Sequence, residues 1–391
     1  MNVLDYIKWR GDLSFEQDPI NEVDLGLISM LAYLPFEDLK IEINIKKLTI
    51  KTIASLIKKH TEKIVLGLII PNQVLELIDL MAHAKRFSGV VLSNYVHHIE
   101  MKLKGQELDT QFCAFCVDIS THRLVVFSGT DDTVVGWKED FTMLSALETP
   151  AQKEALLYLE KVANDKKLIL CGHSKGGNLA LYCLNGTSDE IDSSIERVYN
   201  FDGPGLTTEV EKVNFSRMEK YYIYLPQTAI VGELFNQYGT KVITKSCLKG
   251  LFQHDIFTWE VLQNKFVIEK RPTADGAYMN RKIKEIISEL SAEEKGIFLE
   301  VLFNLLDATD ATTLIELQNK KQKLIKSYID LDAETKKAFN SIINKLILDR
   351  VFQRYIFDNI KEYHTISKSK KEPKKKEKNI ISSIIKTNKK E

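Results

Sequence analysis

Cysteine is scarce in this chain, since the 391 residues include only five, an odd number. Two of them form the pair Cys113-x-x-Cys116, but no second pair exists that could complete a zinc site. The surrounding residues, 111–117, predict a strand, and residues three apart on a strand point to opposite faces. We therefore expect buried free thiols, as in a reducing compartment, and neither a metal site nor a redox pair.

The chain also has no long apolar run and no excess of charge. Residues 1–12 carry charged side chains where a signal peptide requires an apolar core. No apolar run approaches the ~18 residues that span a bilayer, so we expect a cytoplasmic protein. Lys and Arg together number 54, as do Asp and Glu, which gives a formal net charge of zero. This balance argues against a general nucleic-acid binder.

Apolar residues make up 44% of the sequence, enough for one large domain and a smaller appended one. From residue 111 onward, short apolar strands alternate with helical patterns, which predicts an α/β fold with a mostly parallel sheet covered by helices on both faces. The expected strands are 111–117, 124–127, 168–171, 197–201, 220–225 and 240–244, and the expected helices are 21–33, 51–60, 73–85, 150–163 and 177–184.

The pattern divides the chain into three parts. Residues 1–270 form the α/β domain, 271–364 an all-helical appendage and 365–391 a basic tail. The tail holds ten Lys and three Glu, so its formal charge is +7 (ten minus three) without the terminal carboxylate. We expect a solvated, disordered tail. Its amphipathic patch at 379–386 leaves peripheral docking on an anionic membrane open.

One stretch combines the features of a nucleophile elbow. Residues 168–171 predict a buried strand, 172–176 read Gly-His-Ser-Lys-Gly, which fits G-x-S-x-G, and 177–184 predict a helix. A serine at the tip of such a strained turn is exposed only if the flanking positions carry no colliding side chains, hence the glycines. The helix N-terminus favours developing negative charge. Ser174 is therefore the candidate nucleophile, and the alternative is a structural turn with an incidental serine.

A serine hydroxyl requires a base, and histidine has a suitable pKa. In sites built on such an elbow the base follows the nucleophile in the chain, and only two of the eight histidines do so. His364 lies at the start of the basic tail, whereas His254 follows the last expected strand, so His254 is the candidate base. His173 is expected to point away from the elbow tip and to be structural.

The third member of the site must be a carboxylate. Asp202 ends the strand that follows the elbow unit, at the carboxyl edge of the sheet, where a Gly-Pro-Gly loop would hold it. Glu233 and Asp255 are fallbacks, although Asp255 would struggle to reach the far nitrogen of the adjacent His254. The structural alternative is that Asp202 only caps the turn.

An oxyanion hole requires two backbone N–H donors. One is expected from Lys175, immediately after the nucleophile, and the other from Thr130, where an early strand ends in a glycine turn. Trp137 and Asp140 would brace that loop. A purely structural turn is the alternative.

With these pieces placed, the chain resembles the class 3 lipases of the α/β-hydrolase superfamily, and more closely the Mbeg1-like bacterial family, a domain of unknown function related to them. The resemblance covers roughly residues 20 to 265. Its motifs are 127–141, 172–180, 201–205 and 253–255 with Trp259. It implies hydrolysis of an acyl ester with Ser174 as nucleophile, His254 as base, and Thr130 and Lys175 at the oxyanion hole.

Two positions depart from the class 3 pattern. Ser128 stands where those lipases usually carry Arg before Gly-Thr. No carboxylate follows the strand that ends at Pro226-Gln227, so either the acid has moved to Asp202 or the triad is incomplete.

The sequence thus predicts a serine hydrolase of the lipase or esterase type, acting on a small-molecule or lipid ester through an acyl-enzyme, without metal or organic cofactor. The alternative is a catalytically weak or inactive scaffold that binds a lipid or acyl ligand or a protein partner.

Overall fold

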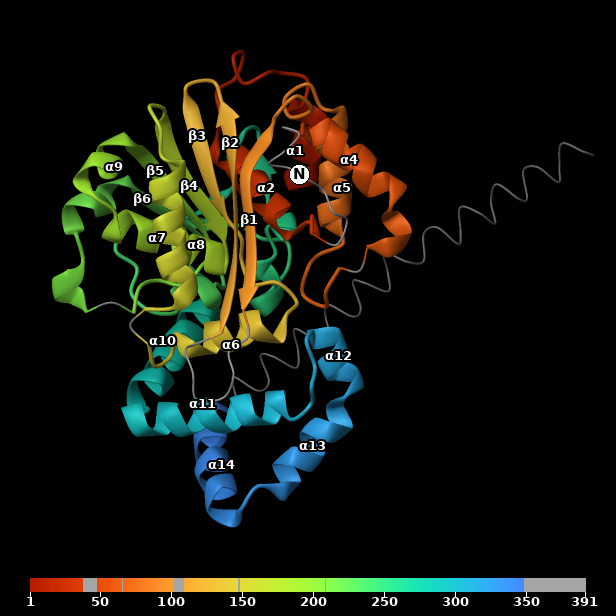
Figure 1. Cartoon of the computed structure of the whole chain (residues 1–391). Coiled ribbons are helices and arrows are strands. Elements are labelled where there is room, and N and C mark those ends of the chain that lie inside the picture. The colour runs from red at the N-terminus through yellow and green to blue at the C-terminus, as the bar shows by residue number, and fades with distance from the viewer. Residues whose placement is uncertain (38–47, 65, 101–108, 147, 208, 348–391) are drawn as a thin grey trace, which may run out of the picture.

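The computed structural model describes residues 1–37, 48–64, 66–100, 109–146, 148–207 and 209–347. The predicted basic tail, 365–391, and the last part of the predicted appendage lie outside these ranges. The described residues build a central sheet of eight strands in the order β1-β2-β3-β4-β5-β6-β7-β10 (Figure 1). Neighbouring strands from β3 to β7 run parallel, and the pairs at both edges are antiparallel. The predicted α/β class with a mostly parallel sheet is confirmed.

Of the eight strands in this sheet, β2 to β7 lie close to the six predicted positions, whereas β1 and β10 were not predicted. Their bounds are β1 Leu92–Glu100, β2 Thr110–Ile119, β3 His122–Phe127, β4 Lys167–His173, β5 Ile195–Phe201, β6 Tyr221–Pro226, β7 Thr240–Thr244 and β10 Ile268–Glu269. A small second sheet in the described part pairs β8 Val261–Leu262 with β9 Lys265–Phe266.

Helices cover both faces of the sheet, and the core has two corresponding halves (Figure 1). One half contains residues of α1 Val3–Arg10, α2 Glu22–Met30, α4 Ile50–Lys59 and α5 Gln73–His83, and the other contains residues of α7 Pro150–Val162 and α8 Lys175–Gly186. The short helix α9 Asp189–Ser194 precedes β5.

The apolar run of β4 is buried on both faces. Cys171 packs in the first half of the core and Leu170 in the second, as expected for a central parallel strand. On β2, Cys113 and Cys116 likewise belong to opposite halves, and both thiols are free and buried. This confirms the predicted strand and excludes a Cys113–Cys116 pair. Cys247, by contrast, is exposed, so the expectation of buried thiols does not extend to it.

A helical region follows the sheet, which confirms the predicted helical character of this part of the chain. It comprises α10 Ala274–Glu289, α11 Ala292–Asp307, α12 Leu314–Asn319, α13 Lys321–Asp330 and α14 Ala333–Ile347 (Figure 1). Phe298 of α11 stacks on Phe339 of α14 at 5.7 Å between ring centroids, which forms a small separate core.

The helical region packs against α6 Val134–Thr142. Two backbone hydrogen bonds of 2.9 Å, from Leu314 to the carbonyl of Asp132 and from Val134 to that of Thr312, join it to the start of α6. The ammonium group of Lys138 lies 3.1 Å from the carboxylate of Asp307. The helices therefore support the segment that follows Thr130.

The length and the apolar character of a helix determine whether it can cross a membrane. In the described ranges, no helix combines the length and the apolar character that crossing a bilayer requires.

Candidate active site

Ser174 occupies the turn between β4 and α8, as predicted. Its backbone has φ 57° and ψ −131°, a conformation that costs energy for any residue with a side chain. A Cβ at Gly172 would lie 2.3 Å from the carbonyl carbon of Gly176, and one at Gly176 would lie 2.1 Å from the carbonyl oxygen of Phe127. Only glycine fits at either position, so the G-x-S-x-G spacing reflects direct backbone contact between β3, β4 and α8.

His254 and Asp202 form a hydrogen bond. The Nδ1 atom of His254 lies 2.7 Å from Oδ2 of Asp202, although the two residues are 52 positions apart. The imidazole is partly exposed, whereas the Asp202 side chain is 1% exposed. This arrangement leaves Nε2 of His254 as the nitrogen available to a substrate or nucleophile.

The loop after β5 fixes Asp202 in place. Its backbone N–H donates to the carbonyl of Tyr224 at 2.9 Å, and its Oδ1 accepts a 3.1 Å hydrogen bond from the N–H of Gly232. Its φ of 52° is a strained value for a non-glycine residue. Burial raises the pKa of the Asp202 carboxyl, and the hydrogen bond with His254 opposes that increase. Asp202 therefore has a partner and an orientation that a simple turn cap does not require.

The two fallback carboxylates are engaged elsewhere. Glu233 lies 3.0 Å from Lys241 and 2.9 Å from Lys284. Although burial opposes the change, these two ammonium groups lower its pKa. Asp255 accepts from the N–H of Phe257 at 2.9 Å, and burial raises its pKa to about 6. Among the described residues, neither carboxylate hydrogen-bonds the ring of His254.

The segment that carries His254 has its own anchors. The indole N–H of Trp259 donates to the carbonyl of Gln253 at 2.7 Å. The amide side chain of Gln253 accepts from the N–H of Thr228 at 2.8 Å and donates to the carbonyl of Leu248 at 2.6 Å. These bonds explain why Gln253 and Trp259 accompany His254 in the sequence motif.

The hydroxyl of Ser174 forms no hydrogen bond with His254 among the residues that the structure describes. The ring of His254 instead lies against that of His173, the residue before the nucleophile, with 4.5 Å between centroids. In enzymes without substrate, the bond between nucleophile and base is often long and shortens only in the complex. The imidazole of His254 therefore lies beside the elbow, but within the described residues it forms no hydrogen bond with the Ser174 hydroxyl.

The loop that carries Thr130 lies beside the elbow. A Cβ at Gly129 would lie 2.8 Å from the carbonyl oxygen of His173, which shows how closely the two segments approach. The hydroxyl of Thr130 donates to the carboxylate of Asp140, so the predicted bracing role of Asp140 agrees with this contact. Ser128, at the position where Arg was expected from the resemblance, is 3% exposed and donates to the carbonyl of Ala32 at 3.2 Å.

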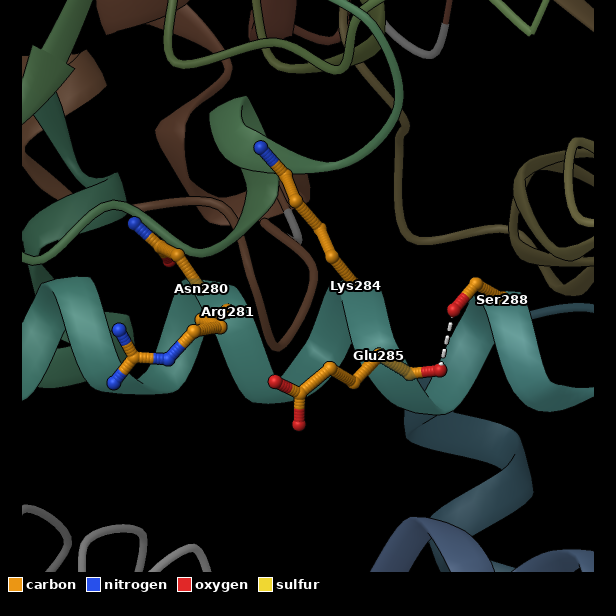
Figure 2. A pocket seen from close by; sticks show the side chains of 5 residues that line it. All are labelled: Asn280, Arg281, Lys284, Glu285 and Ser288. Atoms are coloured by element: carbon orange, nitrogen blue, oxygen red, sulfur yellow. Dashed lines mark hydrogen bonds between the residues drawn. The ribbon is translucent and has the colours of Figure 1, made fainter.

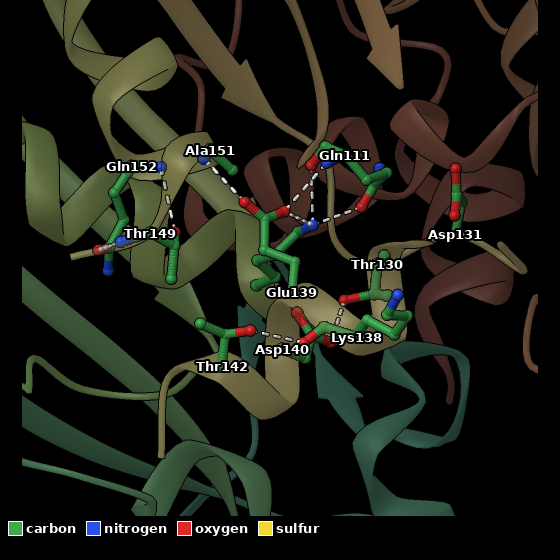
Figure 3. A network of polar contacts seen from close by, with 12 residues as sticks. Gln111, Thr130, Asp131, Lys138, Glu139, Asp140, Thr142, Thr149, Ala151 and Gln152 are labelled. Carbon is green, nitrogen blue, oxygen red and sulfur yellow. Dashed lines mark hydrogen bonds and ion pairs between the residues drawn. The ribbon is translucent and has the colours of Figure 1, made fainter. Parts of the chain in front are cut away.

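The side chain of Lys175 is a feature that the sequence analysis missed. Its ammonium group is buried, 3.1 Å from the carboxylate of Glu139 and 2.8 Å from the carbonyl of Gln111. Glu139 also accepts from the N–H groups of Gln111 at 3.1 Å and of Ala151 at 2.8 Å (Figure 3). Burial lowers the pKa of Lys175, but Glu139 and Asp140 outweigh it, so the net shift is upward.

This ion pair ties α6 to the start of α8. The backbone N–H of Lys175, at the first position of α8, belongs to the donors that a helix leaves free. A charged side chain immediately after the nucleophile, in a helix that carries no other charged residue, was the available signal. The acidic stretch at 139–140 lies on another element, and sequence spacing alone did not pair it with Lys175.

The model of the Mbeg1-like family matches residues 81–304, more than half of the chain. The chain belongs to the Mbeg1-like family. The match contains all five proposed site residues and also spans α10 and most of α11. No curated protein matches the sequence.

Among solved structures, the chain is similar to the Lip2 lipase from Yarrowia lipolytica. The sequences are 15% identical, and the alignment covers 65% of this chain and 96% of that chain, with a TM-score of 0.29. A TM-score this low supports no conclusion about activity.

Two hollows lie on the described part of this Mbeg1-like chain. A hollow of about 520 Å³ lies along α10, lined by Asn280, Arg281, Lys284, Glu285 and Ser288 (Figure 2). None of these residues belongs to the proposed site. A second hollow borders His254 and Asp202, with apolar walls that include Ile230 and Leu251, and has no room for a water-sized sphere. An acyl chain bound there would have to displace its walls.

In the described ranges, no three His, Cys, Asp or Glu side chains cluster so that they could hold a metal ion.

The pKa of Asp140 predicts how its replacement changes stability with pH. Burial raises this pKa from 3.8 to about 6. At pH 3 the carboxyl is protonated in the folded and unfolded chains, and its favourable contribution to folding is lost as the pH rises through 6. For Asp140→Asn, we expect the unfolding free energy, relative to wild type, to increase by on the order of 2 kcal/mol between pH 3 and 7 in urea titrations.

Asp118 provides a control of opposite sign. Its hydrogen bonds with Arg123 lower its pKa, so its contribution is present at neutral pH and lost as the pH falls. The relative stability of Asp118→Asn should therefore decrease between pH 3 and 7. A pH-independent difference for Asp140→Asn would contradict the inferred burial of that carboxyl.

Proposed function

We propose that this protein is a serine hydrolase that cleaves a carboxylic ester through an acyl-enzyme. The observation that carries the proposal is the 2.7 Å hydrogen bond between His254 and Asp202 beside the elbow of Ser174. A buried carboxylate on Nδ1 fixes the imidazole so that Nε2 can accept a proton. The fold supports this reading because Ser174, Asp202 and His254 all follow the carboxyl ends of sheet strands.

In the proposed mechanism, the Ser174 oxygen attacks the ester carbonyl while Nε2 of His254 takes the hydroxyl proton. Asp202 stabilises the resulting imidazolium. The N–H groups of Lys175 and Thr130 donate to the oxyanion. His254 then protonates the leaving alcohol, and a water molecule, activated by the same imidazole, hydrolyses the acyl-serine.

The substrate class that we propose is a small-molecule or lipid ester, because the hollow beside His254 has apolar walls. We also propose a cytoplasmic location, which the free cysteines support.

A second candidate function is a scaffold that binds an acyl ligand without turnover. Two observations favour it: the absence of a Ser174–His254 hydrogen bond in the described chain, and the closed hollow beside His254. The intact elbow and the His254–Asp202 pair favour the enzyme.

Replacing Ser174 distinguishes the two candidates. Because the hydroxyl is the proposed nucleophile, Ser174→Ala should lower kcat for short p-nitrophenyl esters by on the order of 10³-fold or more. The circular dichroism spectrum and melting temperature should stay close to those of wild type. Ser193→Ala, at an exposed serine of α9, is the matched control and should keep full activity. Equal turnover by Ser174→Ala and wild type would exclude the serine mechanism.

Replacing Asp202 tests the assignment of the acid. Asp202→Asn no longer supplies the charge that stabilises the imidazolium, so we expect kcat to fall by about 10²- to 10⁴-fold with little change in KM. Glu233→Gln should leave kcat within about twofold of wild type, because the Glu233 carboxylate binds two lysines and not His254. The reverse result, with Glu233→Gln inactive and Asp202→Asn active, would move the acid to Glu233.

A further inference from the structure

The buried side chains of Tyr33 and His173 contact the site, although the proposed mechanism does not use them. The hydroxyl of Tyr33 lies 2.8 Å from Nδ1 of His173, and Nε2 of His173 lies 2.7 Å from the backbone oxygen of His254. Tyr33 is 9% exposed and His173 is 5% exposed. A continuous chain of hydrogen bonds therefore runs from Tyr33 to the backbone of the proposed base.

The direction of this chain follows from the chemistry of its acceptor. A carbonyl oxygen can only accept, so Nε2 of His173 must carry the hydrogen. Burial lowers the pKa of His173 well below its usual value, which keeps the ring neutral. Nδ1 is then an acceptor, and the Tyr33 hydroxyl donates to it. Tyr33 thus fixes the tautomer of His173 that can donate to His254.

The same pair touches the other two segments of the site. Tyr33 comes from the turn η1 Leu31–Tyr33 after α2, and its ring packs edge-on against His173 at 5.7 Å between centroids. A Cβ at Gly129 would lie 1.9 Å from the Tyr33 hydroxyl oxygen. His173 itself precedes Ser174 and packs against the ring of His254. The Tyr33–His173 pair therefore lies where the loops of Thr130, Ser174 and His254 converge.

We propose that Tyr33 and His173 are positioning residues for the hydrolase: through the backbone carbonyl of His254, they hold the imidazole of the base at the nucleophile elbow. This inference rests on the proposed function, because it concerns the placement of that base. It assigns a role beyond packing to the histidine of the Gly-His-Ser-Lys-Gly motif. It also brings α2 and η1, which precede the part of the chain matched by the family model, into the site.

The fold of the base loop does not depend on this bond alone. Trp259 and Gln253 anchor the loop independently through the bonds described above. Removing the His173 donor should therefore leave a folded protein in which the His254 backbone is less restrained. Misplacement of a catalytic group by about 1 Å can cost on the order of 10²-fold in rate, so the effect should fall on kcat.

The experiment compares three variants of the full chain by p-nitrophenyl ester turnover and thermal melting. His173→Leu removes the donor. His173→Gln keeps an amide N–H that can reach the position of Nε2. Tyr33→Phe keeps the ring and removes the hydroxyl. We expect kcat to fall about 30- to 100-fold for His173→Leu and about 3- to 10-fold for Tyr33→Phe, with KM within about twofold and with most of the loss restored in His173→Gln.

A histidine away from the site provides the matched control. His122, at the start of β3, contacts Glu196, and His122→Leu should leave both kinetic constants unchanged. Wild-type kcat in folded His173→Leu, or a folded His173→Gln as slow as His173→Leu, would overturn the inference. If His173→Leu does not fold, Tyr33→Phe decides: a lower kcat at an unchanged KM supports the role, and wild-type kinetics overturn it.

Failure of the inference can be told from failure of the proposed function. Wild-type protein that turns over ester through Ser174 while the Tyr33 and His173 variants match it overturns the inference alone. Wild-type protein without ester turnover overturns both.

Discussion

The hydrogen bond between His254 and Asp202 is the contact on which the proposed site depends. It joins a loop after β7 to the end of β5, and it requires Asp202 to be buried and to adopt a left-handed backbone conformation. Both requirements cost free energy, because a buried carboxylate loses its hydration and a side chain at positive φ is strained. The bonds from Gly232 and His254 offset part of that cost. Such an expensive arrangement is typical of functional sites.

Close backbone approach is the second constraint. Gly172 and Gly176 allow β3, β4 and α8 to meet at distances that any side chain would block, and Gly129 does the same for the neighbouring loop. The buried pair of Lys175 and Glu139 then holds α6 against the elbow helix. On its outer side α6 contacts the helical region through Lys138 and Asp307. The proposed oxyanion loop is therefore supported from both sides.

Much of the fold could be predicted from the sequence because its signals are local. The apolar run before Ser174, the glycines around it and the helix after it each depend on a few consecutive residues. The placement of Asp202 next to His254 also followed from local information, since parallel strands bring their carboxyl ends to one edge of the sheet. The family assignment and the α/β class are confirmed. The roles of the individual site residues stay predictions.

Contacts between segments that are far apart in the chain could not be predicted from the sequence. Lys175 was assigned only its backbone N–H, because nothing in the spacing indicates that its ammonium group meets Glu139 of α6. His173 was expected to be structural, but its hydrogen bonds join it to Tyr33 and to the backbone of His254, which lie in two segments far from it in the sequence. Such contacts span up to 140 positions and have no periodic signal.

The most direct test of the central claim is reaction of the purified protein with a fluorophosphonate, followed by peptide mapping in a mass spectrometer. This reagent traps an activated serine because the attack requires the base and the oxyanion hole to act together. The account predicts one adduct, on the peptide that contains Ser174, and its loss when His254 is replaced by Ala. A folded protein that forms no adduct, or that forms it equally well without His254, would contradict the account.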